Sequence, residues 1–141
     1  MKSIFQEDIW VPGSLAQIWA GDVPVGYTFS LRIADVRGTH LSCLENFTIS
    51  QDGKNVPEDL IQFCLNGKVL SPREFPNLGY EYWRIDDAAQ VRVLNGADLE
   101  RVRDLTVAFG MRVPYTGTWG SCVVAPFRRE ILRDGKVVAW Q

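Results

Sequence analysis

The amino-acid sequence predicts an all-β fold, an antiparallel β-sandwich or jelly roll in which residues 1–141 form a single domain. Apolar and polar side chains alternate along the most hydrophobic segments, which is the period of a half-buried strand. Dipeptides that favour tight turns separate these segments. No segment keeps the 3.6-residue period of a helix, so helices are expected to be few and short.

Two long segments show the alternation most clearly. In residues 25–34, one face carries Val25, Tyr27, Phe29, Leu31 and Ile33. In residues 104–114, one face carries Leu105, Val107, Phe109, Met111 and Val113. Both segments are long for strands, and we therefore expect them to be central members of an antiparallel sheet.

Turn signals divide the rest of the chain into shorter elements. Four dipeptides are of the type that favours a two-residue hairpin: Asp52–Gly53, Asn66–Gly67, Asn95–Gly96 and Asp134–Gly135. A further turn through residues 87–88 is expected to join a strand at 80–86 to a strand at 90–94. Single helical turns are expected at 57–60 and 71–75, where proline suits the first helical position. Residues 97–104 could form another helical turn or lead into a strand.

Composition and charge exclude several classes of protein. The formal net charge of −2 argues against nucleic-acid binding, which requires a basic face. No apolar run approaches the roughly 20 residues that span a bilayer, and the first residues lack the apolar core of a secretory signal. We therefore expect a cytoplasmic protein that does not bind membranes. Cys43, Cys64 and Cys122 are then expected to be reduced, buried thiols.

The segment NLGYEYWRID, residues 77–86, gathers aromatic and charged side chains. In a strand, Trp83 and Ile85 would point into the core, and Tyr80, Tyr82 and Arg84 would point outward. The outward group could be ordinary cross-strand packing, or it could be a binding surface, because tyrosine and arginine are enriched at interface hot spots. We expect it to face either solvent or a partner.

Few residues are candidates for a catalytic or ligand-binding role. His40 is the single histidine, and it could be a general base or a structural residue at the start of a strand. Cys43 lies three positions further on and would occupy the opposite face of a strand, which argues against a cysteine nucleophile. Residues 113–120 place Tyr115 and Trp119 among Gly, Thr and Pro. This loop either recognises a ligand or folds back over an open end of the sandwich.

Four stretches of the chain form a recognisable series: RGTHLSCLENFTISQDGKNV (37–56), FCLNGKVLSPREF (63–75), EYWRIDDAAQVRV (81–93) and GMRVPY (110–115). Together they resemble the small β subunit of bacterial C-glycoside deglycosidases. The resemblance covers residues 25–115 and rests on the order and spacing of strand and turn segments. No catalytic signature is part of it.

The resemblance implies an all-β accessory subunit that works with a larger TIM-barrel α subunit similar to sugar isomerases. A catalytic base and a divalent metal, usually manganese, would belong to the α subunit, and this chain would hold no catalytic residue, cofactor or metal. The complex would cleave the carbon–carbon bond between a 3-keto sugar and an aromatic aglycone such as a flavonoid. The keto group acidifies the C2 hydrogen, the metal stabilises the enolate, and the aglycone leaves from C1 by elimination.

The resemblance also suggests a role for the aromatic loop. A β subunit over the mouth of the barrel could contribute Tyr115, Trp119 and Arg112 to a lid over the aglycone. Two other functions stay open from the residues alone. One is a stand-alone carbohydrate-binding module that stacks sugars on Tyr80, Tyr82 and Trp119, and the other is a small enzyme centred on His40.

Overall fold

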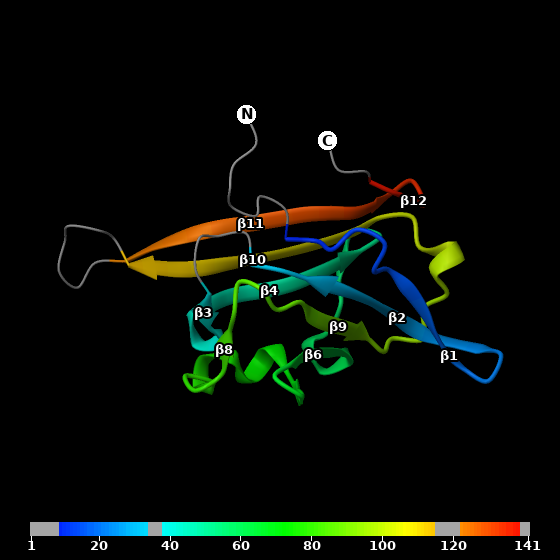
Figure 1. Cartoon of the computed structure of the whole chain (residues 1–141). Helices are drawn as coiled ribbons and strands as arrows, with labels where there is room; N and C mark the ends of the chain where they lie inside the picture. The colour runs from blue at the N-terminus through cyan, green and yellow to red at the C-terminus, as the bar shows by residue number, and fades with distance from the viewer. Residues whose placement is uncertain (1–8, 34–37, 115–121, 139–141) are drawn as a thin grey trace.

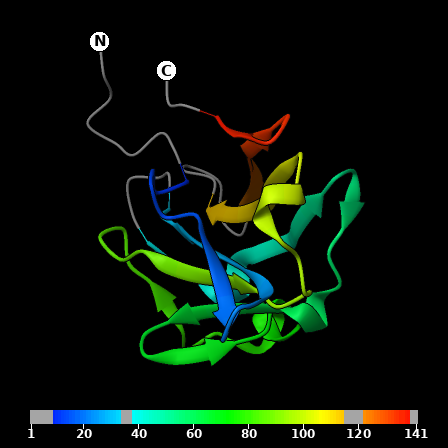
Figure 2. The same ribbon diagram turned by 90° about the vertical axis from the view of Figure 1, so that its right-hand side faces the viewer.

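Two five-stranded antiparallel sheets pack around one core in the computed structural model, which describes residues 9–33, 38–114 and 122–138 (Figures 1 and 2). In spatial order, the β1 sheet contains β1 (Ala16–Ala20), β2 (Val23–Leu31), β9 (Ala89–Val93), β6 (Ile61–Leu65) and β7 (Lys68–Leu70). The β10 sheet contains β12 (Lys136–Val137), β11 (Cys122–Arg133), β10 (Leu105–Pro114), β4 (Leu44–Gln51) and β5 (Lys54–Asn55). The predicted all-β sandwich is confirmed.

The two long alternating segments form β2 and β10, and each has a hydrogen-bonded neighbour on both sides, as predicted. Their predicted inward residues are buried, apart from the half-buried Val25, wherever the structure describes the side chain: Tyr27, Phe29, Leu31, Ile33, Leu105, Val107, Phe109 and Met111. Burying a large apolar side chain contributes about 1.5–3 kcal/mol, so this core is the main source of stability. The Tyr27 hydroxyl also donates to Gln51 Oε1 at 2.7 Å, which links the two sheets.

Three of the four predicted hairpin turns are confirmed. Asp52, Asn66 and Asp134 have positive φ angles, and each is followed by a glycine that also has a positive φ. The fourth prediction is wrong, because Asn95–Gly96 leads from β9 to a helical turn and so from one sheet to the other. There the Asn95 side chain donates to Gln51 Oε1 at 2.9 Å, a contact between the layers that replaces the hairpin.

The predicted hairpin between residues 80–86 and 90–94 is also wrong. β8 (Tyr82–Trp83) pairs with β3 (Thr39–His40) in a separate two-stranded sheet, whereas β9 pairs with β2 and β6. The Trp83 indole nitrogen donates to the Asp87 carbonyl at 3.0 Å inside the connecting loop. This contact closes the loop that follows β8.

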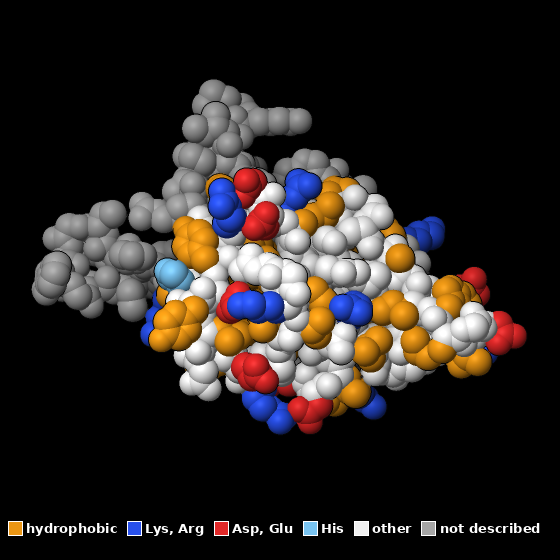
Figure 3. Space-filling model, turned by 60° about the horizontal axis from the view of Figure 1, so that its bottom comes forward, with side chains coloured by type: hydrophobic (Ala, Val, Ile, Leu, Met, Phe, Trp, Pro, Cys, Tyr) orange, Lys and Arg blue, Asp and Glu red, His pale blue; other side chains and the backbone are white. Residues whose placement is uncertain are grey.

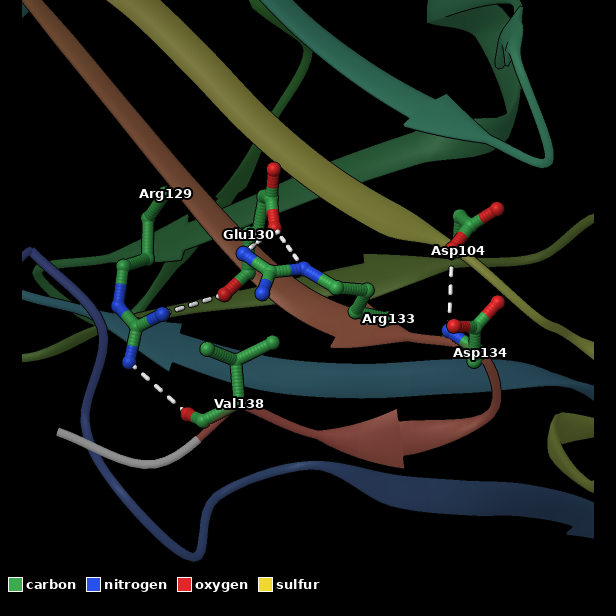
Figure 4. Close-up of polar contacts among 6 residues, drawn as sticks. All are labelled: Asp104, Arg129, Glu130, Arg133, Asp134 and Val138. Atoms are coloured by element: carbon green, nitrogen blue, oxygen red, sulfur yellow. Dashed lines mark hydrogen bonds and ion pairs between the residues drawn. The ribbon is translucent and has the colours of Figure 1, made fainter.

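The C-terminal hairpin of β11 and β12 is confirmed, and Figure 4 shows polar contacts within the hairpin and at its turn. The Arg129 guanidinium donates to the Val138 carbonyl at 3.0 Å and lies 5.2 Å from the centre of the Trp10 ring. At the turn, the Asp134 backbone nitrogen donates to Asp104 Oδ1 at 3.1 Å (Figure 4). The hairpin is therefore held at both of its ends.

In the described ranges, helical structure is limited to short 3-10 segments, as predicted: η1 (Leu41–Cys43), η2 (Glu58–Leu60), η3 (Pro72–Asn77) and η4 (Leu99–Arg101). Among the residues that the structure describes, no helix is long and apolar enough to cross a membrane. Cys43 and Cys64 are free thiols but half-buried rather than buried. For Cys64 the reason is that β6 turns Phe63 and Leu65 into the core, which leaves Cys64 on the outer face. The Cys122 side chain lies outside the described part of the chain.

Candidate functional site

Five of the seven residues predicted to face a substrate or partner belong to one end of the sandwich. We call this group the Tyr82 surface; it consists of His40, Tyr80, Tyr82, Arg84 and Arg112. The pairing of β3 with β8 places His40 opposite Tyr82. Arg112 lies near the C-terminal end of β10. Figure 1 shows β3, β8 and the end of β10 together at the left of the molecule. The other two predicted residues, Tyr115 and Trp119, lie outside the described residues.

His40 and Tyr82 form a cross-strand aromatic pair at the centre of this surface. Their ring centres are 4.9 Å apart and the ring planes meet at 76°, an edge-to-face contact. Both side chains remain open to solvent, and Tyr82 is 40% exposed. Tyr80 is 97% exposed. The prediction that Tyr80, Tyr82 and Arg84 point outward is confirmed.

Gly38 allows the Tyr82 ring to lie close to the backbone that precedes β3. A Cβ atom at this position would be 2.3 Å from the Trp83 carbonyl oxygen and 2.8 Å from Cε2 of Tyr82. Both distances are shorter than real Cβ contacts, so only glycine fits without a shift of β8. The position of the Tyr82 ring therefore depends on a residue with no side chain.

Trp83 anchors the surface to the core. Its side chain is fully buried, and it meets Phe63 edge-on with ring centres 5.3 Å apart. Because neighbouring residues of a strand point to opposite faces, burying Trp83 turns Tyr82 outward. Ile85 was predicted to be a core residue beside Trp83, but it is only half-buried, because β8 ends at Trp83 and the alternation ends with it.

A buried carboxylate fixes β8 from the other side. Glu81 is 7% exposed, accepts a hydrogen bond from Asn66 Nδ2 at 3.2 Å, and pairs with the Lys68 ammonium. Asn66 Nδ2 also donates to the Tyr82 carbonyl at 3.0 Å. The hydrogen bonds from Lys68 and then Asn66 lower the pKa of the Glu81 carboxyl below its usual 4.5. The β6–β7 hairpin thus holds the strand that presents Tyr82.

Acidification is expected to loosen this connection. A carboxyl whose pKa is lowered in the folded state adds stability above its unfolded pKa, and that stability is lost as pH falls through the folded pKa. Glu81→Gln is therefore expected to melt below wild type at pH 7, and the two melting temperatures should converge as pH falls below 4.5. Thermal melts followed by circular dichroism from pH 7 to pH 3 measure this. A gap between the two proteins that stays constant over the whole range would contradict the role of Glu81.

Arg112 connects the end of β10 to η1. Its guanidinium is 3.0 Å from Glu45 Oε1 and donates to the Ser42 carbonyl at 3.1 Å. Ser42 lies in η1, which directly follows β3, so this contact ties the end of β10 to the segment that follows His40. The Arg112 side chain is about half exposed, so these contacts cover only part of it.

A shallow hollow opens beside the Tyr82 ring. It is lined by Gly38, Asn66, Tyr80, Tyr82, Arg84, Ile85 and Asp86. Arg84 and Asp86 lie 3.4 Å apart at its edge. Figure 3 shows the histidine between hydrophobic side chains at this end of the molecule, with charged side chains nearby. Aromatic walls with a charged rim suit a flat ring that carries oxygen substituents, or an apolar segment of another protein.

Two of the chemical arrangements considered for this chain involve residues that the structure describes: His40 with Cys43, and a metal-binding group. Residues 41–43 form the helical turn η1, so the expected strand with His40 and Cys43 on opposite faces is wrong. In the described part of the chain, no three His, Cys, Asp or Glu side chains come together as a metal-binding group.

The described residues thus form an antiparallel all-β domain that presents an exposed aromatic and charged surface at one end. A comparison with family models identifies the class of protein. The model of the C-glycoside deglycosidase beta subunit family matches residues 5–115 of the 141-residue chain. The chain therefore belongs to this family, and the resemblance seen in the sequence is confirmed. A search of curated proteins finds no match.

Proposed function

We propose that this chain is the accessory subunit of a heteromeric C-glycoside deglycosidase. Its family membership over residues 5–115 is the observation that carries the proposal. The partner in this proposal is a TIM-barrel subunit that holds the catalytic base and a divalent metal. The complex cleaves the carbon–carbon bond between the sugar and the aromatic aglycone of a 3-oxo-C-glycoside.

In this proposal the Tyr82 surface faces the partner at the entrance of its catalytic centre. The rings of Tyr80 and Tyr82 cover the aglycone, and they exclude water from the reacting bond. Arg84 and Arg112 supply positive charge toward the phenolic oxygens of the aglycone, which become more negative as the bond breaks. The geometry that supports this is the outward Tyr82 ring, which is held between Gly38 and His40.

Co-expression with the barrel subunit tests the proposal. The tagged chain is expected to co-purify with that subunit, and the mass of the product should be that of a complex rather than of either chain alone. A tagged chain that elutes alone, with the barrel protein in the flow-through, would rule out the accessory-subunit function. Sugar-binding measurements on the isolated chain would then test the alternative of a carbohydrate-binding module.

Removing the Tyr82 ring is expected to weaken the complex. Tyrosine at an interface centre commonly contributes about 2 kcal/mol, so Tyr82→Ala should bind the barrel subunit about 30-fold more weakly. Biolayer interferometry with immobilised barrel subunit gives the affinity, and the rate of aglycone release gives the activity. Val137→Ala is a matched control, because Val137 is also partly exposed but lies on β12, away from this surface. Equal affinity and equal activity of Tyr82→Ala and the control would show that Tyr82 faces solvent only.

A further inference from the structure

A second hollow lies where β4, three of the short helical segments and the end of β10 meet. Its volume is about 390 Å³, which is within the range of small-ligand sites. None of its lining residues lines the hollow beside the Tyr82 ring, so the two hollows are distinct. Six of the lining residues decide what it could bind: Glu45, Asn46, Glu58, Arg73, Pro76 and Arg112. We call it the Asn46 hollow.

A β-bulge in β4 brings two neighbouring polar side chains to this hollow. The pairing of β4 with β10 shifts register where Asn46 and Phe47 together lie opposite Phe109. Asn46 has a φ angle of +53°, whereas the other non-glycine residues with positive φ in the described ranges lie in hairpin turns. Neighbouring residues of a regular strand point to opposite faces, but here Glu45 and Asn46 both line the hollow. Bulges are common beside binding sites, where they re-aim a side chain.

The Asn46 amide is available to a ligand. The side chain is exposed, and within the described ranges it makes no hydrogen bond. An amide group can donate two hydrogen bonds through its nitrogen and accept through its oxygen. Asn46 can therefore bind a group that both donates and accepts, such as a hydroxyl.

Two ion pairs line the hollow and balance its charge. Arg112 Nε lies 3.0 Å from Glu45 Oε1, and Arg73 Nε lies 3.7 Å from Glu58 Oε2. Each pair uses only some of the five N–H donors of a guanidinium and the acceptor positions of a carboxylate. An anion would have to compete with the two carboxylates, and a cation with the two guanidinium groups. The arrangement therefore favours a neutral ligand that both donates and accepts hydrogen bonds.

Apolar side chains form another part of the wall, and the core holds them in place. Pro72 and Phe75 are buried, whereas Pro76 is exposed. The Phe75 ring meets Phe47 and Phe63 edge-on, with ring centres 5.8 Å and 5.1 Å apart. Because this wall is part of the core, the hollow is formed before a ligand binds, which reduces the entropy lost on binding.

We propose that the Asn46 hollow binds a neutral pyranose sugar. The apolar C–H face of the sugar ring packs on Pro76, and its hydroxyl groups bond to the Asn46 amide and to the Glu45–Arg112 pair. A zwitterionic amino acid also carries both charges, but it would have to break two ion pairs that already exist. The inference goes beyond the proposed function, because it concerns this chain alone and needs no partner subunit.

Nuclear magnetic resonance of the ¹⁵N-labelled full-length chain, titrated with methyl glycosides of glucose, galactose, mannose and xylose, tests the inference. At least one glycoside should shift the signals of the Asn46 amide and of Arg112 in a saturable way. Asn46→Gly removes the amide but keeps a residue that accepts a positive φ angle, so the bulge should persist. This variant should bind about tenfold more weakly than wild type.

Asn77→Gly is the matched control, because Asn77 is exposed at the end of η3 and does not line the hollow. It should bind with the affinity of wild type, and circular dichroism checks that both variants are folded. Glucuronic acid and glucosamine carry opposite charges, and both should bind more weakly than the neutral glycoside.

Four results would overturn the inference. The first is the absence of a saturable shift with every methyl glycoside. The second is a set of shifts centred on His40 and Tyr82, which would place the sugar on the Tyr82 surface instead. The third is equal affinity of Asn46→Gly and wild type. The fourth is tighter binding of glucuronic acid or glucosamine, which would make the ligand an ion.

Discussion

Trp83→Ala is expected to destabilise the protein by about 4 kcal/mol, since removing a buried aromatic side chain costs roughly 3–5 kcal/mol. The side chain is fully buried, meets Phe63 at 5.3 Å, and lies 6.3 Å from Phe109 of the other sheet. The substitution leaves a cavity between the sheets and removes the donor to the Asp87 carbonyl. A domain with a typical stability of about 5–15 kcal/mol would lose a large part of it.

Urea unfolding followed by circular dichroism measures this loss. Trp83→Phe keeps most of the ring but not the indole donor, and it should cost less than Trp83→Ala. If β8 carries the Tyr82 surface as described, both variants should also weaken binding to the barrel subunit, in the order of their destabilisation. A loss below about 1 kcal/mol for Trp83→Ala, typical of an exposed site, would contradict the anchoring role of Trp83.

Gly26→Ala is expected to have the second-largest effect, a loss of about 3 kcal/mol or more. Gly26 has a φ angle of +150°, and a Cβ atom there would be 1.9 Å from the Val93 carbonyl oxygen. The obstacle is backbone of the neighbouring strand, which cannot rotate away as a side chain can. Gly26 also lies where the pairing of β1 with β2 shifts register. A methyl group at this position has to separate β2 from β9.

Gly21→Ala is the matched control for this substitution. Gly21 belongs to the same hairpin and has a φ angle of +64°, but no atom lies within 4 Å of a Cβ placed there. The control should lose only the cost of a left-handed residue, about 1–2 kcal/mol. Chemical denaturation of both variants gives their free energies of unfolding. The difference between the two losses is the cost of the clash with the Val93 carbonyl, apart from the cost of a positive φ angle. Equal losses for the two variants would show that β2 and β9 can move apart freely.

Much of this fold could be predicted because it depends on local patterns. Alternation identified the inward face of β2 and of β10, since a residue such as Phe29 or Phe109 has to face the core in any sandwich. Asp52–Gly53 and Asn66–Gly67 closed hairpins because their positive φ angles fit such turns. In each case the determining interactions lie within a few residues of the sequence.

The errors concern contacts between distant parts of the chain. β8 was expected to pair with the segment that follows it, but its partner is β3, about 40 residues earlier. Asn95–Gly96 has a hairpin sequence, yet the Asn95 side chain contacts Gln51 of the other sheet. The pairing partner of β8 and the contact of Asn95 cannot be predicted from neighbouring residues in the sequence, because both depend on how the two sheets pack.

The candidate site was predictable only where it depends on the alternation of residues within one strand. The alternation around Trp83 correctly gave the outward direction of Tyr82, but not the ring of His40 against it. Two supporting residues were missed. Gly38 has no side chain to draw attention, and Glu81 reads as one more acid until Lys68 and Asn66 are seen around it. Glu81 shares the face of Trp83 in a strand, and that position was the one available signal for its burial.

We propose that this chain is a required but non-catalytic subunit. The most direct measurement is the release of aglycone from a 3-oxo-C-glycoside by this chain alone, by the barrel subunit alone, and by the two recombined. We predict no release by this chain alone, and full activity only when both subunits are present. Full activity of the barrel subunit without this chain, or release by this chain without the barrel subunit, would contradict this function.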